Sequence, residues 1–483
     1  MSSSAPKNSN NTHSAAKKAA PTAFKANGPI PFREALAVWI KISLLSFGGP
    51  AGQIALMHRL IVDEKKWISN ERFLHALNFC MVLPGPEAQQ LTIYLGWLMH
   101  RVWGGIVAGV LFVLPGAVTV LLLSILYAGF QDVMLVEALF FGIKAAVLAI
   151  VIQALIKIAQ KTLHRPRLVA IAGIAFLAVF FANIPFPLVI ILAGLAGWML
   201  ARDETASQAA SQAASQAAEK PENALENAPN QSLEHAAPPP SAARNVKVLA
   251  ICLTLWLAPL LGMWMALGPS HVFVQEAVFF SQMAMVTFGG AYAVLAYMAQ
   301  QAVGVYGWLN AGEMLDGLGM AETTPGPLIM VVQFVGFMGA YRNPGMLDPF
   351  LAGTLGAAVT TWVTFAPCFL WIFLGAPYIE RLRGNRHLSA ALKGITAAVV
   401  GVMLNLALWF GMRVMFQEMN SVDLLIVEGL PLTFTWPEVS SIDLATAAIA
   451  MSAFLAMARF KVGMIKTLAI SAAVGVVYGV VAG

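Results

Sequence analysis

The sequence TTPGPLIM, from Thr323 to Met330, places two prolines and a glycine inside an apolar part of the chain. Its flanks, Leu315–Met320 and Leu328–Met338, have the composition of a membrane segment. A near copy, VLPGPEAQ, occupies Val82–Gln89. Because proline lacks a backbone N–H and its ring blocks a helix interior, the two sequences predict two buried helices that are broken in the same way.

The composition identifies the kind of protein in which these breaks occur. The chain has 483 residues, of which 59% are hydrophobic and 11% charged, and its mean hydropathy is +0.73. Long apolar runs recur from Ala35 onward, which predicts an all-α polytopic integral membrane protein. A β-barrel would need short alternating segments, and none are visible. The multi-pass chain is expected in the cell (inner or plasma) membrane, with the lipid bilayer as its surroundings.

The charge and the cysteines give no evidence for another partner. The net charge of +5 fits basic residues that set membrane orientation, and we expect no nucleic acid partner. Cys80, Cys252 and Cys368 lie far apart in apolar segments, where small buried side chains are a better interpretation than a metal or redox site. We therefore expect no metal and no cofactor.

The chain contains an internal duplication. An offset of 241 residues aligns the motif Phe47-Gly48-Gly49 with Phe288-Gly289-Gly290, and Pro84-Gly85-Pro86 with Pro325-Gly326-Pro327, without a gap. Farther along, an offset of 252 aligns Pro115 with Pro367. Matches at spaced glycines and prolines over this length predict two copies of one structural unit.

One additional apolar segment separates the copies and predicts that the second is inverted. Six segments return the chain to its starting side, and a seventh reverses the entry of the second copy. This is the architecture of secondary transporters. The expected parts are a disordered cytoplasmic tail (1–30), an N-terminal repeat (31–201), a disordered linker (202–245), a connecting transmembrane helix (246–268) and a C-terminal inverted repeat (269–483).

The loop charges test this topology. With the N-terminus in the cytoplasm, most Lys- and Arg-bearing loops fall inside and the C-terminus falls outside. The loop with Arg59, Lys65, Lys66 and Arg72 disagrees if its flanking segments cross fully. It agrees if the four broken segments are re-entrant hairpins, which predicts nine full crossings and four re-entrant elements. Whether these segments are re-entrant or fully spanning stays open at this stage.

The breaks have the chemistry of an anion site. A helix start exposes unpaired N–H groups and carries about half a positive charge, and glycine lets a ligand approach the backbone. Kinks that serve only packing are the alternative. The residues predicted to bind substrate at the breaks are Ser46, Phe47, Gly48, Gly49, Pro50, Gln53, Pro84, Gly85, Pro86, Gln90, Thr287, Gly289, Gly290, Thr323, Thr324, Pro325, Gly326 and Pro327.

Ionisable side chains inside membrane segments are functional candidates. Lys144 is predicted to contact substrate, although a snorkelling lysine is the alternative. Lys41, Glu87 and Glu322 are candidates for coupling transport to a proton or another ion. For Glu87 the alternative is a simple complement to the helix dipole.

These motifs resemble those of the chromate ion transporter family. The stretches that carry the resemblance are SFGGPAGQIALMH and LPGPEAQQLTIYLG in the first copy, and TFGGAYAVLAYM and MAETTPGPLIM in the second. The resemblance covers nearly the whole chain except the tail and linker. It implies export of chromate from the cytoplasm, with resistance to chromate as the result. Ala291 departs from the pattern, since Pro50 stands at the equivalent position of the first copy.

Three alternatives remain beside chromate export. Sulfate resembles chromate in shape and charge, so another oxyanion is possible. A channel also uses half-helices, and the sequence separates it poorly from a carrier. A membrane enzyme is disfavoured because no HExxH, paired CxxC or Asp-rich motif occurs. The coupling ion and the oligomeric state are not indicated by the sequence.

Overall fold

The structure, a computed structural model, describes residues 30–47, 49–131, 133–200, 241–288, 291–378, 386–427 and 430–482. The expected tail (1–30) and linker (202–245) lie outside these residues, apart from residue 30 and residues 241–245. Among the described residues, six helices are long and apolar enough to cross a membrane. The chain is therefore an α-helical, multi-pass membrane protein.

The first half of the chain consists of short helices followed by long ones. The elements are α1 (Phe32–Leu45), α2 (Gly49–His58), the π-helix η1 (Arg59–Glu64), α3 (Asn70–Cys80), α4 (Glu87–Phe130), α5 (Met134–Thr162), α6 (Pro166–Phe180) and a helix over Phe186–Leu200. The long α4 is kinked, because His100 and Arg101 leave helical geometry.

The second half begins with α8 (Ala242–Leu267), which starts four residues before the connecting helix expected at 246. It continues with α9 (Val272–Met285), α10 (Ala291–Ala299), η2 (Gln300–Val305), α11 (Ala311–Thr323), η3 (Leu328–Met330), α12 (Val331–Arg342), α13 (Pro349–Gly375), η4 (Ala376–Tyr378), α15 (Arg386–Met415), β1 (Met419–Val427), β2 (Leu430–Pro437), η5 (Val439–Ser441), α16 (Leu444–Ala458) and α17 (Met464–Ala482).

The two halves use the same local geometry at equivalent positions. The π-helices η1 and η2 are related by the offset of 241 residues, and α5 and α15 begin 252 residues apart. Side chains cap α3 and α11 at equivalent residues, Ser69 and Asn310, by accepting hydrogen bonds from backbone N–H groups. Asn310 and Glu313 complete a capping box at the start of α11.

Backbone angles that are rare for L-residues also recur in pairs. Gly85 and Gly326 have φ values of 125° and 104°, and these two residues are related by the offset of 241. Asn183 and Lys461 have φ values of 48° and 54° in the turns that follow α6 and α16. Such angles are costly for most residues, so their recurrence reflects two copies of one chain path.

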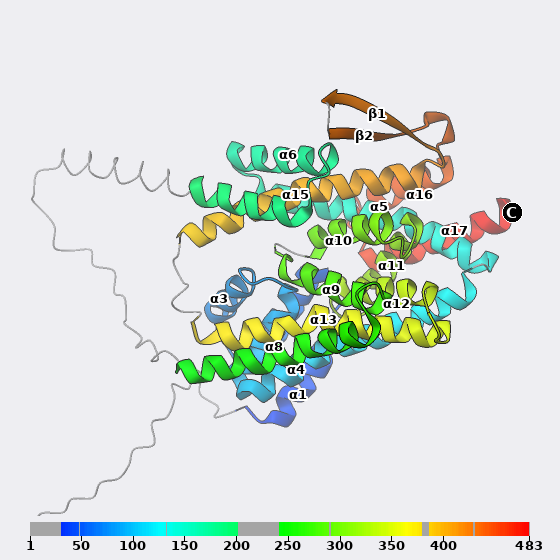
Figure 1. The fold of residues 1–483 in the computed structure, drawn as a ribbon. Helices are drawn as coiled ribbons and strands as arrows, with labels where there is room; N and C mark the ends of the chain where they lie inside the picture. The colour runs from blue at the N-terminus through cyan, green and yellow to red at the C-terminus, as the bar shows by residue number, and fades with distance from the viewer. Residues whose placement is uncertain are drawn as a thin grey trace, which may run out of the picture.

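The β-hairpin was not expected in an all-α chain. Strands β1 and β2 pair antiparallel, with Met419 opposite Pro437 and Leu424 opposite Leu432. The hairpin lies beyond α6 and α15 at the top of Figure 1. The hairpin falls between α15 and α16, whereas the first half has only a short turn between α5 and α6. This insertion raises the offset between equivalent residues of the two halves from 252 to 278.

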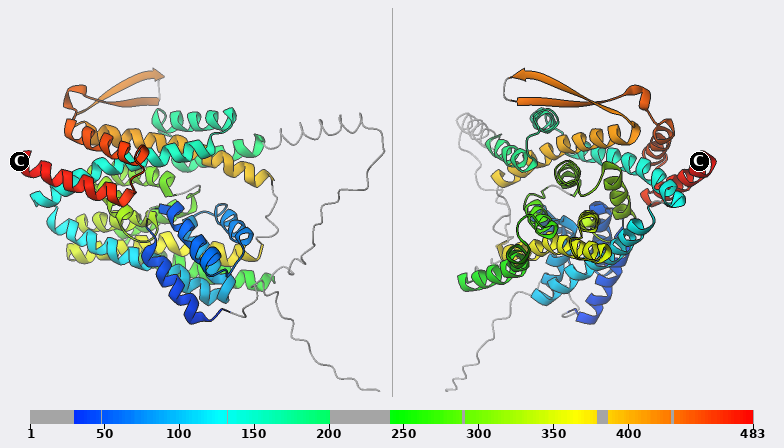
Figure 2. Two further views of the ribbon diagram at one scale, coloured as in Figure 1. Left: turned by 180° about the vertical axis from the view of Figure 1, so that it is seen from behind. Right: turned by 45° about the vertical axis from the view of Figure 1, so that its right-hand side comes forward.

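The helices form two groups, with α10 and α11 between them (Figure 1). One group contains α1, α4, α8, α9, α12 and α13, and the other contains α5, α6, α15, α16 and α17. Each group combines helices from both halves. Figure 2, seen from behind, shows the blue N-terminal helices lying along the first group.

Small residues allow the long helices of the second group to approach closely across the halves. A Cβ on Gly142 of α5 would lie 1.9 Å from the carbonyl oxygen of Ser471 in α17. The equivalent Gly394 of α15 would meet the carbonyl oxygen of Ala193 at 2.3 Å. The last helix of each half therefore packs on the long helix of the other half, through the small-residue contact common in membranes.

Candidate functional site: four broken helices at one centre

The first pair of breaks separates α1 from α2 and α9 from α10. Ser46 and Phe47 lie between α1 and α2, and Gly49 begins α2 with a φ of 72°. Thr287 and Phe288 occupy the equivalent place after α9. Three predicted residues here, Gly48, Gly289 and Gly290, lie outside the described residues.

The second pair of breaks is formed by the two PGP sequences. Pro84 and Gly85 precede Pro86, which stands immediately before the first residue of α4. Pro327 stands in the same position before η3, which leads directly into α12. Proline is favoured at a helix start because its missing N–H has no intrahelical partner there.

Each PGP loop is hydrogen-bonded to the first break of the other half. The N–H of Gly85 donates to the carbonyl oxygen of Thr287 over 2.8 Å. The N–H of Gly326 donates to the carbonyl oxygen of Ser46 over 2.9 Å. Gly85 corresponds to Gly326, and Ser46 corresponds to Thr287. The two hydrogen bonds are therefore equivalent, which is the pattern that a two-fold axis between the halves produces.

Each PGP loop also packs on a proline-containing helix of the other half. A Cβ on Gly116 of α4 would lie 2.6 Å from the carbonyl oxygen of Pro325. A Cβ on Gly85 would lie 3.1 Å from the Sγ of Cys368 in α13. Gly116 and Cys368 are equivalent residues next to Pro115 and Pro367, so the second packing contact is also reciprocal.

Three helix starts line one pocket. The lining residues come from the first turns of α2, α4 and η3, and thus from both halves; they are Pro50, Gln53, Pro86, Glu87, Ala88, Pro327, Leu328 and Ile329. The first N–H groups of a helix have no intrahelical partner, and the aligned peptide dipoles place partial positive charge there. The pocket therefore has the chemistry of an anion site.

The predicted hydroxyl ligands are already engaged. Ser46 Oγ donates to the carbonyl oxygen of Ile42, and Thr287 Oγ1 to that of Met283, both over 2.7 Å. Thr323 Oγ1 donates to Gly319 O at 3.0 Å, and Thr324 Oγ1 to Ala321 O at 3.3 Å. These hydroxyls satisfy carbonyl groups at the ends of the broken helices, so donors to an anion would come from the backbone.

Three glutamines surround the PGP loops. Gln53 Nε2 donates to the carbonyl oxygen of Gly326 over 2.5 Å, and Gln90 Nε2 donates to that of Pro84 over 2.7 Å. Gln89 is 0% exposed, and neither its Nε2 nor its Oε1 has a hydrogen-bond partner among the described residues. Its place in the first turn after Pro86 was the sequence signal for it.

The two acidic candidates, Glu87 and Glu322, both lie close to the breaks. Glu87 lines the pocket in the first turn of α4. Glu322 is 3% exposed, and its Oε1 accepts a hydrogen bond from the hydroxyl of Tyr292 over 2.7 Å. That hydroxyl is 3.9 Å from the Cβ position of Gly49, so Tyr292 connects Glu322 with the break before α2.

The structure places the two lysines away from the pocket. Lys41 has an exposed side chain (53%), and its Nζ is 4.0 Å from Glu64. Lys144 Nζ is 3.2 Å from Oδ2 of the buried Asp316, which also accepts a hydrogen bond from Tyr127 over 2.8 Å. Sequence reasoning missed Asp316, which lies in α11 and joins the two halves through this ion pair.

No group of three His, Cys, Asp or Glu side chains among the described residues is arranged to hold a metal ion. The chemistry available at the breaks is that of backbone amides, glutamine amides and carboxyl groups.

A model of the chromate transporter family matches residues 33–198 and again residues 274–476. The chain belongs to the chromate transporter family. Each match covers one half, so the family unit occurs twice in this chain.

Curated relatives of the family are similar over most of their length. The chain is 30% identical to a chromate transport protein of Pseudomonas aeruginosa over 78% of this chain and 80% of the relative. It is 27% identical to a chromate transport protein of Cupriavidus metallidurans over 83% and 88%, respectively. A probable chromate transport protein of Synechococcus elongatus is 26% identical over 82% and 88%. No solved structure matches the chain.

Proposed function

We propose that this chain is a secondary transporter that exports chromate, a divalent oxyanion, from the cytoplasm across the cell's inner membrane and thereby confers resistance to chromate. The observation that carries the proposal is the pocket that the first turns of α2, α4 and η3 line together. Family membership supplies chromate as the substrate.

The site explains how a doubly charged solute enters an apolar protein. Removing an anion from water is costly unless polar groups replace its hydration shell. Backbone N–H groups at helix starts replace that shell without a desolvated lysine or arginine. A glycine with positive φ in each PGP loop, 125° at Gly85 and 104° at Gly326, lets the loop pack closely against a helix of the other half and so holds the helix starts in place.

The proposed architecture is two inverted repeats of about six membrane segments joined by α8. The reciprocal bonds of Gly85 and Gly326 support a two-fold relation between the halves. The odd number of crossings then places the N-terminus in the cytoplasm and the C-terminus outside, with the broken segments re-entering from one side each. Alternating access follows when one helix group moves against the other around this centre.

For the predicted coupling residues, the geometry favours Glu322 and Glu87 over Lys41. Both carboxyl groups lie at the breaks, whereas Lys41 pairs with Glu64 at an exposed position. A carboxyl group that gains and loses a proton beside the pocket would alter its affinity for a dianion. Lys144 would contribute to the pathway only after Asp316 releases it.

The proposal is tested by transport into inside-out vesicles that contain the protein. A positive potential inside the vesicle should drive saturable chromate uptake to a concentration above that outside. Empty vesicles serve as the control, and radiolabelled sulfate in a parallel series shows whether the site distinguishes the two oxyanions. Absence of chromate uptake by correctly inserted protein would contradict the proposal, and an initial rate that rises with chromate concentration without saturating would indicate a channel.

A further inference from the structure

A second buried carboxyl group, remote from the pocket, has no place in the function proposed above. Glu276 lies in the second turn of α9 and is 0% exposed, and neither of its carboxyl oxygens has a hydrogen-bond partner. The equivalent residue of the first half is Ala35, which is also buried. The fold therefore does not require a carboxyl group at this position.

The surrounding helices leave room for this side chain at two glycines. A Cβ on Gly339 of α12 would lie 2.7 Å from Oε1 of Glu276, and a Cβ on Gly356 of α13 would lie 3.0 Å from Oε2. The ring of Trp308 closes the same space, at 3.0 Å from the Cβ position of Gly339. Any larger residue at either glycine would displace the carboxyl group.

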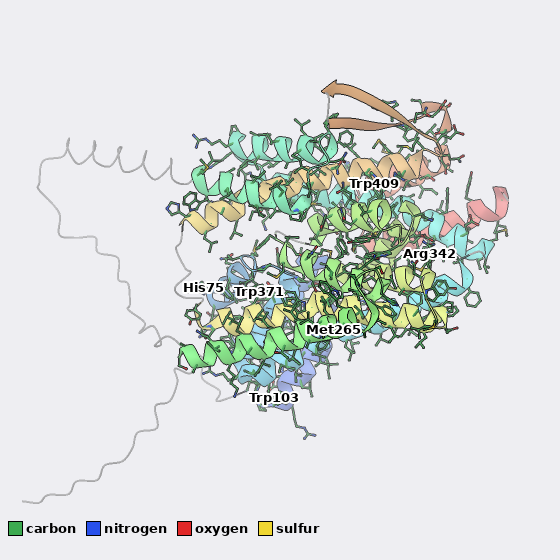
Figure 3. The ribbon with its side chains drawn as sticks, viewed as in Figure 1. His75, Trp103, Met265, Arg342, Trp371 and Trp409 are labelled. Carbon is green, nitrogen blue, oxygen red and sulfur yellow. The ribbon has the colours of Figure 1, made fainter. Side chains whose placement is uncertain are left out.

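No cation among the described residues is paired with Glu276. On α12, the guanidinium of Arg342 donates to the carbonyl oxygen of Trp308 over 3.0 Å and is paired with Glu313. Figure 3 shows Arg342 at the end of the helix group. The other titratable groups on segments packed against α9 are the N-cap His271, Tyr297 and Tyr306 beside Phe279, Tyr341 beside Phe337, Cys368 on α13, and Arg244, Lys247 and Cys252 on α8.

None of these groups forms a hydrogen bond or ion pair with Glu276 in the described part of the chain, so an ionised Glu276 would be a buried charge without a partner there. Such a charge costs several kcal/mol even after relaxation, by order of magnitude. The neutral acid is therefore the form that fits this conformation.

We propose that Glu276 is a proton-binding site whose occupancy alternates during the transport cycle and couples proton movement to oxyanion movement. The link to the pocket is α9 itself. Its last turn is followed by Thr287, whose carbonyl oxygen holds Gly85, about 16 Å from Glu276 at 1.5 Å per residue. Loss of the proton would expel the carboxylate from its glycine slot, move α9 and release the first PGP loop.

This inference rests on the proposed function, and the test separates the two. Purified protein in liposomes is assayed for chromate uptake driven either by a potential at equal pH or by a pH gradient at zero potential. Wild type should respond to both. Glu276→Gln keeps the size of the neutral acid, so it should retain chromate uptake driven by the potential. Its uptake driven by the pH gradient should be at least tenfold lower than that of the wild type. Glu438→Gln, at the residue that follows β2, is the matched control.

Full response of Glu276→Gln to the pH gradient would overturn the coupling role while leaving chromate transport standing. Wild-type protein that transports chromate without any response to the pH gradient would also overturn the coupling role. A second readout does not depend on transport: the infrared spectrum of the wild type should contain a protonated-carboxyl C=O band that Glu276→Gln removes. An unchanged band would show that Glu276 is ionised and would overturn the proton site itself.

Discussion

Gly85 and Gly326 are the residues at which side-chain size and backbone conformation matter most. Both have positive φ, and both donate an N–H across the halves. Alanine at either position is strained by about 1–3 kcal/mol. We expect Gly85→Ala and Gly326→Ala each to lower the initial rate of chromate uptake roughly tenfold, since about 1.4 kcal/mol corresponds to a factor of ten. Leucine at either position should abolish uptake while leaving membrane insertion intact.

A glycine with open space around it provides the control for these variants. Gly262 of α8 has no atom within 4 Å of its Cβ position and lies inside a regular helix. Gly262→Ala should keep the wild-type rate at the same membrane abundance. Full activity in both Gly85→Leu and Gly326→Leu would count against the PGP loops as the site.

Gln89 separates a functional role from a structural one. Its buried amide has no protein partner, so replacement by Leu removes an unsatisfied polar group and should leave thermal stability unchanged or raised. If the amide binds substrate, chromate uptake should nevertheless fall, by roughly five- to tenfold for a hydrogen bond to a charged group. The melting temperature and the uptake rate are measured on the same preparation. A melting temperature that falls together with uptake would indicate a structural residue instead.

At the residue scale, the sequence was sufficient to locate the helix breaks, because these depend on local backbone chemistry. It was not sufficient to identify the partners of polar side chains. Proline and glycine have local conformational consequences, so the breaks before α2, α4 and η3 were visible from their motifs. Lys144 was expected to face substrate, but its partner Asp316 comes from a distant part of the chain that only the fold brings close. The sequence also contained no sign that the hydroxyls of Ser46 and Thr287 donate to carbonyl oxygens one turn earlier; their part in substrate binding stays a prediction.

Among the elements, the close contact between α5 and α17 is the one most sensitive to added volume. Valine at Gly142 would place its Cβ within 2 Å of the carbonyl oxygen of Ser471, so the helices must separate. Overpacking of this kind costs about 1–3 kcal/mol. We expect Gly142→Val and its equivalent Gly394→Val each to lower the melting temperature of detergent-purified protein by several degrees. Gly173→Val, on α6 with no atom within 4 Å of its Cβ position, should leave it unchanged.

The elements also show where sequence periodicity was sufficient and where it was not. Apolar runs of about 20 residues predicted the long helices because a helix satisfies its own backbone groups in lipid. The strands β1 and β2 were missed because they fall in an insertion without a counterpart in the first half, so the repeat gave no guide there. The close helix approaches through Gly142 and Gly394 were visible only as aligned glycines, without their partners.

At the scale of the whole molecule, the two helix groups explain how reciprocal contacts become a transport mechanism. Each group contains corresponding helices from both halves, α4 with α13 and α5 with α15. Helix α11 contacts α4 and α12 of one group and α5, α15 and α17 of the other, so movement of one group against the other would reach the pocket through α11. The acidic residues Glu276, Asp316 and Glu322 all occur in the second half, so the two halves share a backbone path but differ in their ionisable groups.

The inverted arrangement makes a prediction about sidedness at the equivalent ends of η1 and η2. Lys66 and Val305 are exposed at the ends of η1 and η2, respectively. If the repeats are inverted and the broken segments re-enter, Lys66→Cys faces the cytoplasm and Val305→Cys faces the outside. In cells whose native cysteines are replaced by serine, a membrane-impermeant thiol reagent should modify Val305→Cys in intact cells and Lys66→Cys only after permeabilisation. Modification of both from the same side would show that the halves run parallel, and modification of Lys66→Cys from outside would rule out the hairpin. In either case, the proposed two-fold axis could not relate the helix starts that the two halves contribute to the pocket.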